Sequence, residues 1–186
     1  SWSDEYARIL IERVGEAQAV ALLRIYDDAF PESYKEDFEP VTGVDDTLAI
    51  EQLEPAELNL RLYAPVITDS RELRFTVMRV GQAMPLTQVL PILQRLGVDV
   101  IDEHPYEINR ANRPPARILT FGVILPDGGI REFESLFSRF SEAFRACWDG
   151  RCGIDTFNAL VVTAGVDWRQ AMIIRAYARY LRQIGS

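Results

Sequence analysis

Hydrophobic residues in the first part of the chain recur at the spacing of helices. Between residues 4 and 29 they fall three or four positions apart, which is the pattern of an amphipathic helix with one apolar face. Ser3 is placed to cap the start of this stretch, because a serine hydroxyl can accept a hydrogen bond from the first turn. Gly15 is placed to divide the stretch into two helices.

Proline and glycine interrupt the chain after these helices. Pro31 ends the first helical stretch, since proline cannot continue a helix, and a short helical turn is expected over 32–38. Pro40 and Gly43 interrupt the chain again. A further helix is predicted over 45–53.

At residue 58 the pattern changes from helical spacing to an alternation of polar and apolar residues. The alternation runs through two segments, 58–66 and 71–80, with turn-forming residues at 68–70 between them. Two alternating segments joined by a short turn indicate an antiparallel β-hairpin.

Four further elements are predicted after the hairpin. A helix over 85–96 is closed by Gly97, and strands follow over 98–106 and 116–125. The last of the four is a helix over 130–148, whose aromatic residues share one face. These aromatic residues are Phe133, Phe137, Phe140, Phe144 and Trp148.

The order of elements over residues 57–148 is therefore β-β-α-β-β-α. A ferredoxin-like sheet runs β-α-β-β-α-β, and moving its last strand to the front gives the present order. The relocated strand still pairs with the strand that now follows it, as the hairpin requires. We expect an α+β fold, a four-stranded antiparallel sheet with two helices on one face, and flanking helices at both ends of the chain.

The same patterns divide the chain into three parts. A helical lead-in is predicted for 1–56, an α+β domain for 57–150, and a helical connector for 151–186. The connector is expected to contain one helix over 156–164 and a second from Asp167 onward, where Asp167 begins a capping box.

Composition and charge narrow the class of protein. Hydrophobic residues make up 48% of the 186 residues and charged residues 26%, which is typical of a soluble globular protein. The net charge of -8 disfavours nucleic acid as a partner, since phosphates repel an acidic surface. No apolar run approaches the roughly 20 residues that a membrane helix needs, so no membrane partner is expected.

Other features indicate a cytoplasmic piece of a longer chain. The polar, acidic start from Ser1 to Glu5 is unlike a signal peptide, and an initiator methionine is missing. Cys147 and Cys152 are expected to be free thiols, because a disulfide between them would close a very short loop.

The sequence offers no complete set of catalytic, cofactor-binding or metal-binding residues. Asp102 and His104 would share one face of a strand, as an acid–base or metal pair or simply as a polar strand end. Gly128 and Gly129 follow a strand and precede a helix, but the third glycine of a dinucleotide turn is missing. We therefore assign no catalytic, cofactor or metal residue to this chain.

One loop is a candidate site for a small effector. Residues 81–85 link a strand to a helix, and helix N-termini present N–H groups that attract carboxylates. The alternative is an ordinary connection between two elements. The candidate residues are Gly81, Gln82, Met84, Leu86 and Thr87.

Two helices carry candidate interface residues. The aromatic face of the 130–148 helix serves either as core of this chain or as a contact with another domain. The last helix carries three arginines on one face, which would bind an acidic partner or simply face solvent. The candidates are Phe140, Phe144, Trp148, Tyr177 and Arg179.

Several runs of residues resemble the large bacterial NAD-dependent glutamate dehydrogenases. They are AFPESYKEDF at 29–38, PLTQVLPIL at 85–93, GVDVIDEHPYEI at 97–108, FNALV at 157–161 and RAYARYLRQ at 175–183. Together they are spread over most of the chain, from residue 29 to residue 183, in the order of that family. None of them is a catalytic signature.

The resemblance implies a position and a role. It indicates the third ACT-like domain of a long N-terminal region, with helices leading in and helices leading toward a catalytic domain. ACT domains are ferredoxin-like, and they commonly bind amino acids or mediate subunit contacts. The parent reaction implied is oxidative deamination of L-glutamate to 2-oxoglutarate with NAD, carried out downstream, so no cofactor is expected in this fragment.

Three functions compete at this point. The first is a non-catalytic regulatory and assembly segment, whose partners are other domains and subunits of the same enzyme. The second is a sensor module that binds an amino-acid effector. The third is an independent small enzyme, which would need a cluster of titratable groups that the sequence lacks.

Overall fold

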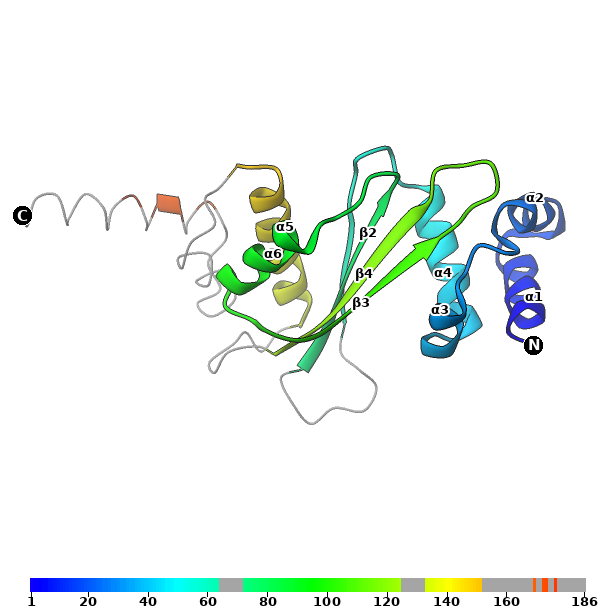
Figure 1. The fold of residues 1–186 in the computed structure, drawn as a ribbon, viewed down its shortest axis with the longest axis horizontal. Coiled ribbons are helices and arrows are strands. Elements are labelled where there is room, and N and C mark those ends of the chain that lie inside the picture. Colours follow the sequence, from blue (N-terminus) through cyan, green and yellow to red (C-terminus); the bar gives the residue numbers. More distant parts are fainter. Residues whose placement is uncertain (64–71, 125–132, 152–168, 170–171, 174–175, 177–186) are drawn as a thin grey trace, which may run out of the picture. The chain divides into compact units, whose positions relative to one another are not determined.

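The computed structural model describes residues 1–63, 72–124, 133–151, 169, 172–173 and 176. In these residues six helices and four strands follow one another in the order α1-α2-α3-α4-β1-β2-α5-β3-β4-α6 (Figure 1). None of the described helices is long and apolar enough to cross a bilayer.

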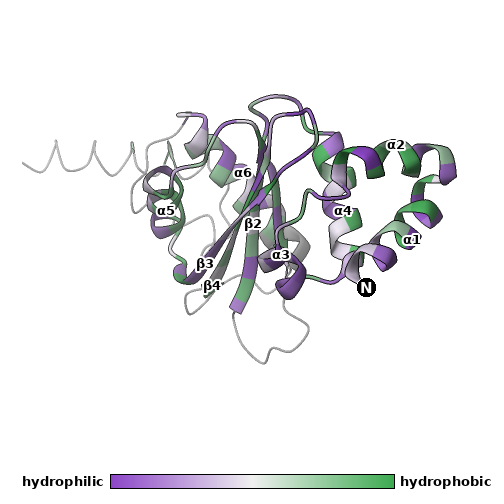
Figure 2. Cartoon of the chain, turned by 45° about the vertical axis from the view of Figure 1, so that its right-hand side comes forward, coloured by the Kyte–Doolittle hydropathy of each residue, from purple (hydrophilic) through white to green (hydrophobic). Residues whose placement is uncertain are grey.

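The chain opens with the predicted pair of helices, α1 (Trp2–Val14) and α2 (Glu16–Tyr26). Gly15 separates them with a φ of +88°, which glycine adopts at little cost because it has no Cβ. Figure 2 shows hydrophobic and hydrophilic residues interleaved along both helices, as amphipathic helices require.

The residue that caps α1 is Ser1, so the prediction of Ser3 was wrong. The Ser1 hydroxyl accepts a hydrogen bond from the N–H of Asp4 at 3.2 Å, and the Asp4 carboxylate accepts from Ser1 in return. This reciprocal arrangement needs an acidic side chain three positions after the cap, which Ser1 has in Asp4.

Helix α3 (Glu32–Asp37) lies where it was predicted, but α4 (Pro40–Glu51) begins before the predicted residue 45. Pro40 occupies the first helical position, where its missing N–H costs nothing. Gly43 lies inside α4, and a Cβ there would come within 2.7 Å of the Trp2 ring. Gly43 therefore allows α1 to pack closely on α4, and it is not a helix break.

The four strands form one antiparallel sheet, in the order β1-β2-β4-β3. They are β1 (Asn59–Tyr63), β2 (Glu72–Val80), β3 (Asp99–Ile108) and β4 (Ala116–Ile124). The predicted hairpin partners are neighbours in a single sheet, and the predicted α+β, ferredoxin-like fold in permuted order is confirmed. The predicted turns at 68–70 and 127–129 lie outside the described residues.

Burial along the strands follows their places in the sheet. The central strands β2 and β4 are continuously buried over residues 75–78 and 118–123. The edge strand β3 is exposed at several positions and contains Pro105, which an edge strand tolerates because no other described strand pairs with one side of its backbone. This exposure accounts for the polar sequence of β3.

Helices α5 (Leu86–Arg95) and α6 (Phe133–Trp148) contact each other. Phe75 of β2 packs against α6, with ring centroids 5.0 Å from Phe140 and 5.2 Å from Phe144. Both helices lie within the ranges predicted for them. Most of the predicted helical connector lies outside the described residues.

The chain folds as two compact units that do not follow its linear order. The first contains Ser1–Asn59, Thr76–Ala83 and His104–Thr120, and the second contains Leu60–Phe75, Met84–Glu103 and Phe121–Ser186. The core of the first unit joins residues of the opening helices, such as Tyr26 and Ile50, to strand residues, such as Met78, Tyr106 and Ile118.

Candidate functional site

The candidate effector loop begins at Gly81, directly after β2. Gly81 has a φ of +90°, a conformation that other residues adopt only with strain. Its N–H donates to the Pro115 carbonyl at 2.8 Å, and its carbonyl accepts from Arg117 Nε at 3.3 Å. A Cβ at Gly81 would meet no atom within 4 Å, so backbone conformation and not space restricts this position.

The other loop residues differ in exposure. Gln82 is exposed, and its side-chain carbonyl accepts a hydrogen bond from Arg79 at 2.8 Å. Met84 is 6% exposed and belongs to the core. Leu86 and Thr87 open α5, at positions where backbone N–H groups have no partner within a helix.

Two of the interface candidates on α6 are core residues of this chain. Phe140 and Phe144 are fully buried. Trp148 is half-buried and stacks on Phe144 with ring centroids 6.4 Å apart. The prediction of an interface through α6 therefore rests on Trp148. Tyr177 and Arg179 lie outside the described residues.

Asp102 belongs to an ion pair that crosses the sheet. Arg74 Nη1 on β2 lies 2.8 and 3.0 Å from the two carboxylate oxygens of Asp102 on β3. The strand between them contributes Gly122, whose N–H donates to Asp102 at 3.0 Å. A Cβ at Gly122 would lie 2.8 Å from Arg74 Nη1 and 2.9 Å from Asp102 Oδ2, so the pair depends on the glycine.

His104, the other residue considered with Asp102, is exposed on β3. Its backbone carbonyl accepts a hydrogen bond from the Thr120 hydroxyl at 3.4 Å. Within the described ranges, no three His, Cys, Asp or Glu side chains are grouped to hold a metal ion.

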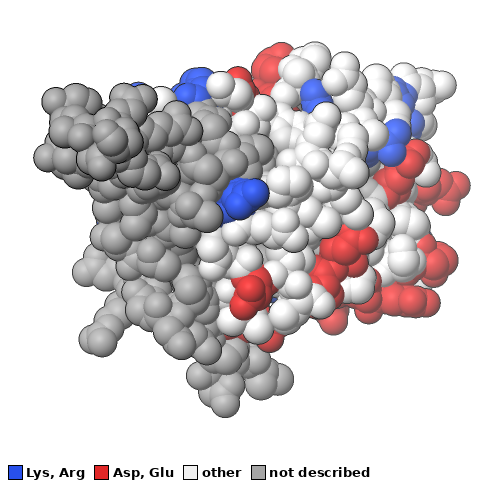
Figure 3. Space-filling view, turned by 60° about the vertical axis from the view of Figure 1, so that its left-hand side comes forward, with Lys and Arg blue, Asp and Glu red and all other residues white. Residues whose placement is uncertain are grey.

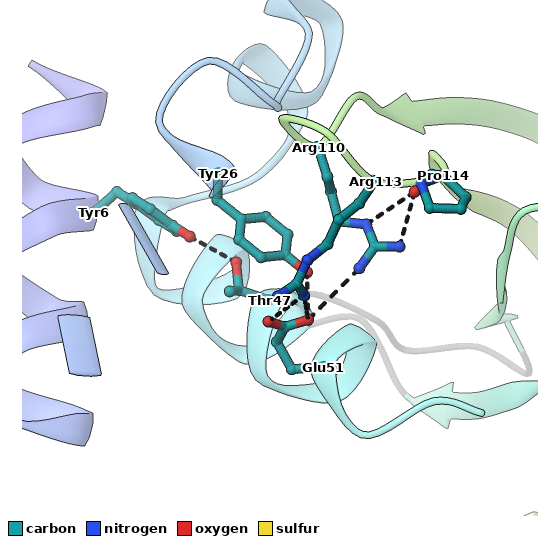
Figure 4. Close-up of polar contacts among 7 residues, drawn as sticks. All are labelled: Tyr6, Tyr26, Thr47, Glu51, Arg110, Arg113 and Pro114. Carbon is teal, nitrogen blue, oxygen red and sulfur yellow. Dashed lines mark hydrogen bonds and ion pairs between the residues drawn. The ribbon is translucent and has the colours of Figure 1, made fainter. Parts of the chain in front are cut away.

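A polar network joins α2 and α4 to the segment between β3 and β4 (Figure 4). The Glu51 carboxylate on α4 lies 3.2 Å from the Tyr26 hydroxyl, 3.5 Å from Arg110 Nη1 and 2.9 Å from Arg113 Nη1. The Arg110 side chain is 6% exposed and also donates to the Pro114 carbonyl at 3.0 and 2.8 Å. Burial, and then the charge of Glu51, raise the pKa of Tyr26, so its hydroxyl stays a donor.

Two more tyrosine hydroxyls find partners in the first compact unit. Tyr106 on β3 donates to Asp37 at 2.6 Å, which ties the strand to α3. The oxygens of Tyr6 and Thr47 lie 2.7 Å apart, between α1 and α4. Burial raises the pKa of Tyr6 to about 12, and the hydrogen bond to Thr47 opposes part of that rise.

The sequence pattern does not indicate this network. Glu51 and Arg113 lie 62 positions apart, and residues 109–114 have the composition of an ordinary loop. The sequence offers one signal, charge: residues 1–57 hold fifteen acidic and four basic residues, which favours contacts with arginines from elsewhere in the chain. Figure 3 shows carboxylates gathered toward one side of the face in view.

Three family models match consecutive stretches of the chain. The model for glutamate dehydrogenase helical motif 2 matches residues 9–53, the one for the glutamate dehydrogenase ACT3 domain matches 57–136, and the one for helical motif 3 matches 152–186. The permuted sheet therefore belongs to the ACT class of domains, and the opening helices match a separate helical motif.

Three NAD-specific glutamate dehydrogenases align with the whole chain. It is 37% identical over 185 residues to an NAD-specific glutamate dehydrogenase of Halomonas elongata and 33% identical over 185 residues to one of Pseudomonas aeruginosa. A third, from Mycobacterium tuberculosis, is 33% identical over 194 aligned residues. The alignments cover 99–100% of this chain but only 11–12% of each relative.

The chain belongs to the family of NAD-specific glutamate dehydrogenases. It corresponds to the segment of those proteins in which the third ACT domain lies between two helical motifs.

Proposed function

We propose that this chain is a non-catalytic regulatory and assembly segment of an NAD-dependent glutamate dehydrogenase. Residues 1–56 serve as a helical lead-in, 57–150 as the ACT-like domain and 151–186 as a helical connector. The parent reaction is oxidative deamination of L-glutamate to 2-oxoglutarate with NAD, and other parts of the enzyme perform it. The partners of the segment are other domains and subunits of the same enzyme.

The observation that carries this proposal is the shared core of the first compact unit. Helices matched by one family model and strands matched by another bury their apolar residues together, and Glu51 and Asp37 bind side chains that come from the strands or the loop between them. A flexible linker would instead carry few contacts across its boundary. A joint built in this way suits a segment that holds neighbouring domains in fixed positions.

A test of the assembly role uses Trp148, which is half-buried at the end of α6. Trp148→Ala in the full-length enzyme should weaken subunit association by about tenfold or more, as loss of an interface tryptophan commonly does. The measurement is oligomer mass against concentration by light scattering. Tyr177→Ala provides a second candidate interface variant.

The matched control is Tyr63→Ala, which removes an aromatic ring that is 39% exposed on β1. This variant should keep the oligomer mass of the natural enzyme. The melting temperature of the isolated chain shows whether any variant simply unfolds. Unchanged mass in both Trp148→Ala and Tyr177→Ala would count against the assembly role.

The second candidate function is amino-acid sensing at the loop that begins at Gly81. It is favoured by the way Gly81 is held: two hydrogen bonds fix its left-handed backbone directly before the chain leads into α5. A ligand carboxylate would meet the N–H groups of Leu86 and Thr87, helped by the positive end of the helix dipole.

Gly81→Ala in the full-length enzyme tests this second function. The substitution strains a backbone with a φ of +90° and should abolish the response of activity to a panel of standard L-amino acids, while basal activity stays within about twofold. Gly15→Ala is the matched control, because Gly15 has a φ of +88° and equally open surroundings. An undiminished response in Gly81→Ala would place any sensor elsewhere, and an equal loss in both variants would indicate general strain.

A further inference from the structure

A hollow of about 270 Å³ lies at the C-terminal end of α2. One wall carries Arg24, Asp27 and Asp28, and the other consists of Asn109 and Ala111 from the segment between β3 and β4. Pockets for drug-sized ligands measure about 300–1,000 Å³. The hollow therefore has room for a small metabolite and is too small for a dinucleotide.

Backbone hydrogen bonds hold the two walls together. The N–H of Ala111 donates to the carbonyl of Ile25 at 3.0 Å, and the N–H of Asn109 donates to the carbonyl of Ala29 at 3.0 Å. The walls cannot separate without breaking these bonds. The hollow is thus a fixed feature of the first compact unit.

The charged side chains of the hollow, those of Arg24, Asp27 and Asp28, are exposed to solvent. Arg24 and Asp28 are four residues apart, the spacing at which opposite charges commonly pair on helices. However, neither they nor Asp27 form a side-chain hydrogen bond or ion pair with any other residue that the structure describes. Both carboxylates also lie at the end of α2 where the helix dipole disfavours negative charge.

We propose that this hollow binds a small zwitterion, of which a free α-amino acid is the simplest example. The ammonium group of the ligand lies near the Asp27 and Asp28 carboxylates, and its carboxylate lies near the Arg24 guanidinium. The Asn109 amide supplies a further hydrogen bond. Both charged contacts are charge-assisted, which makes them stronger than neutral hydrogen bonds. The site is separate from the loop at Gly81, and its existence does not depend on the assembly role.

The hollow is connected to the network around Glu51. Arg110 lies in sequence between the two wall residues Asn109 and Ala111, and it is the buried arginine that lies against Glu51 of α4. A ligand that bridges the two walls would therefore stabilise the attachment of α2 and α4 to this segment. Binding at the hollow should be detectable at the amide of Glu51 as well as at the walls.

The test is a titration of the purified chain followed by backbone amide shifts in NMR spectra. The probes are L-alanine, L-glutamate and L-lysine, together with propionate and ethylamine, which each carry only one of the two charged groups. At least one amino acid should give saturable shifts at Ile25, Asn109 and Ala111. Propionate and ethylamine should bind at least about tenfold more weakly, since each forms only half of the charged contacts.

Variants decide whether the charged side chains bind the probe. Asp28→Asn and Arg24→Gln should each weaken binding about tenfold or more, whereas Glu36→Gln, an exposed acidic position on α3, should leave it unchanged. The absence of saturable shifts with every amino acid overturns the proposal. Binding that survives both Asp28→Asn and Arg24→Gln overturns it too, and propionate binding as tightly as the amino acids would make this an anion site. None of these outcomes bears on oligomer mass, which tests the assembly role.

Discussion

Several tyrosine hydroxyls form hydrogen bonds in or beside the core of the first compact unit. Tyr34 is fully buried and its hydroxyl donates to Asp46 on α4, which is itself 4% exposed. Tyr6, Tyr26 and Tyr106 likewise each have a polar partner. A buried hydroxyl without a hydrogen bond would cost about 1–3 kcal/mol, so these pairings favour the one docking of the helices that satisfies them.

The raised pKa of Tyr6 makes the free energy of unfolding fall as the pH becomes alkaline. Its pKa of about 12 in the folded chain exceeds the ordinary 10.0. From about pH 10 upward the unfolded chain releases this proton while the folded chain retains it, so the stabilisation is lost as the pH approaches 12. The shift corresponds to about 2–3 kcal/mol.

We therefore expect Tyr6→Phe to flatten the fall in the free energy of unfolding between neutral pH and about pH 11. Urea denaturation at the two pH values measures this fall for each protein. Tyr63→Phe, at an exposed tyrosine, should leave the fall unchanged. Equal falls in the natural chain and in Tyr6→Phe would show that other groups govern the alkaline limit.

At the scale of elements, α4 is attached to the segment between β3 and β4 through one carboxylate. Glu51 is 23% exposed and Arg110 is 6% exposed, whereas Arg113 is 43% exposed. Removing Glu51 leaves a buried guanidinium without its counter-charge, which is the costly way to break an ion pair. Removing Arg113 deletes only a solvated partner.

Glu51→Ala should accordingly lower the free energy of unfolding by about 2–3 kcal/mol, below the full cost of a buried pair because Glu51 is partly exposed. Arg113→Ala should lower it by less than about 1 kcal/mol. Urea unfolding followed by tryptophan fluorescence gives both values. A Glu51→Ala cost equal to that of Arg113→Ala would mean that Arg110 does not depend on this carboxylate.

The types of the elements could be predicted from the sequence, because apolar spacing differs clearly between helices and strands. The residue at which α4 begins could not be predicted in this way. Pro40 and Gly43 are read as breaks in a sequence, yet one suits the first turn of a helix and the other makes room for Trp2. That second role depends on a residue of another helix, which no local pattern reveals.

At the scale of the whole chain, the predicted boundary between the helical lead-in, 1–56, and the ACT-like domain, 57–150, does not divide the core. One hydrophobic core contains residues from both parts. The helical periodicity predicts that the opening helices have apolar faces, but it does not show which residues pack against those faces. They include strand residues such as Met78 and Ile118. The hollow at α2 was unpredictable for the same reason, since Asp28 and Asn109 are distant in sequence.

The ion pair that passes over Gly122 has a consequence for how this sequence can change. A Cβ at position 122 would come within 3 Å of the side chains of Arg74, Ile101 and Asp102, so replacing the glycine would displace the ion pair. Loss of the pair alone would not free the position, because the Ile101 side chain would still lie 2.8 Å from a Cβ at residue 122. Positions 74, 102 and 122, on three different strands, are therefore coupled, and we expect a substitution at one of them to require compensation at the others.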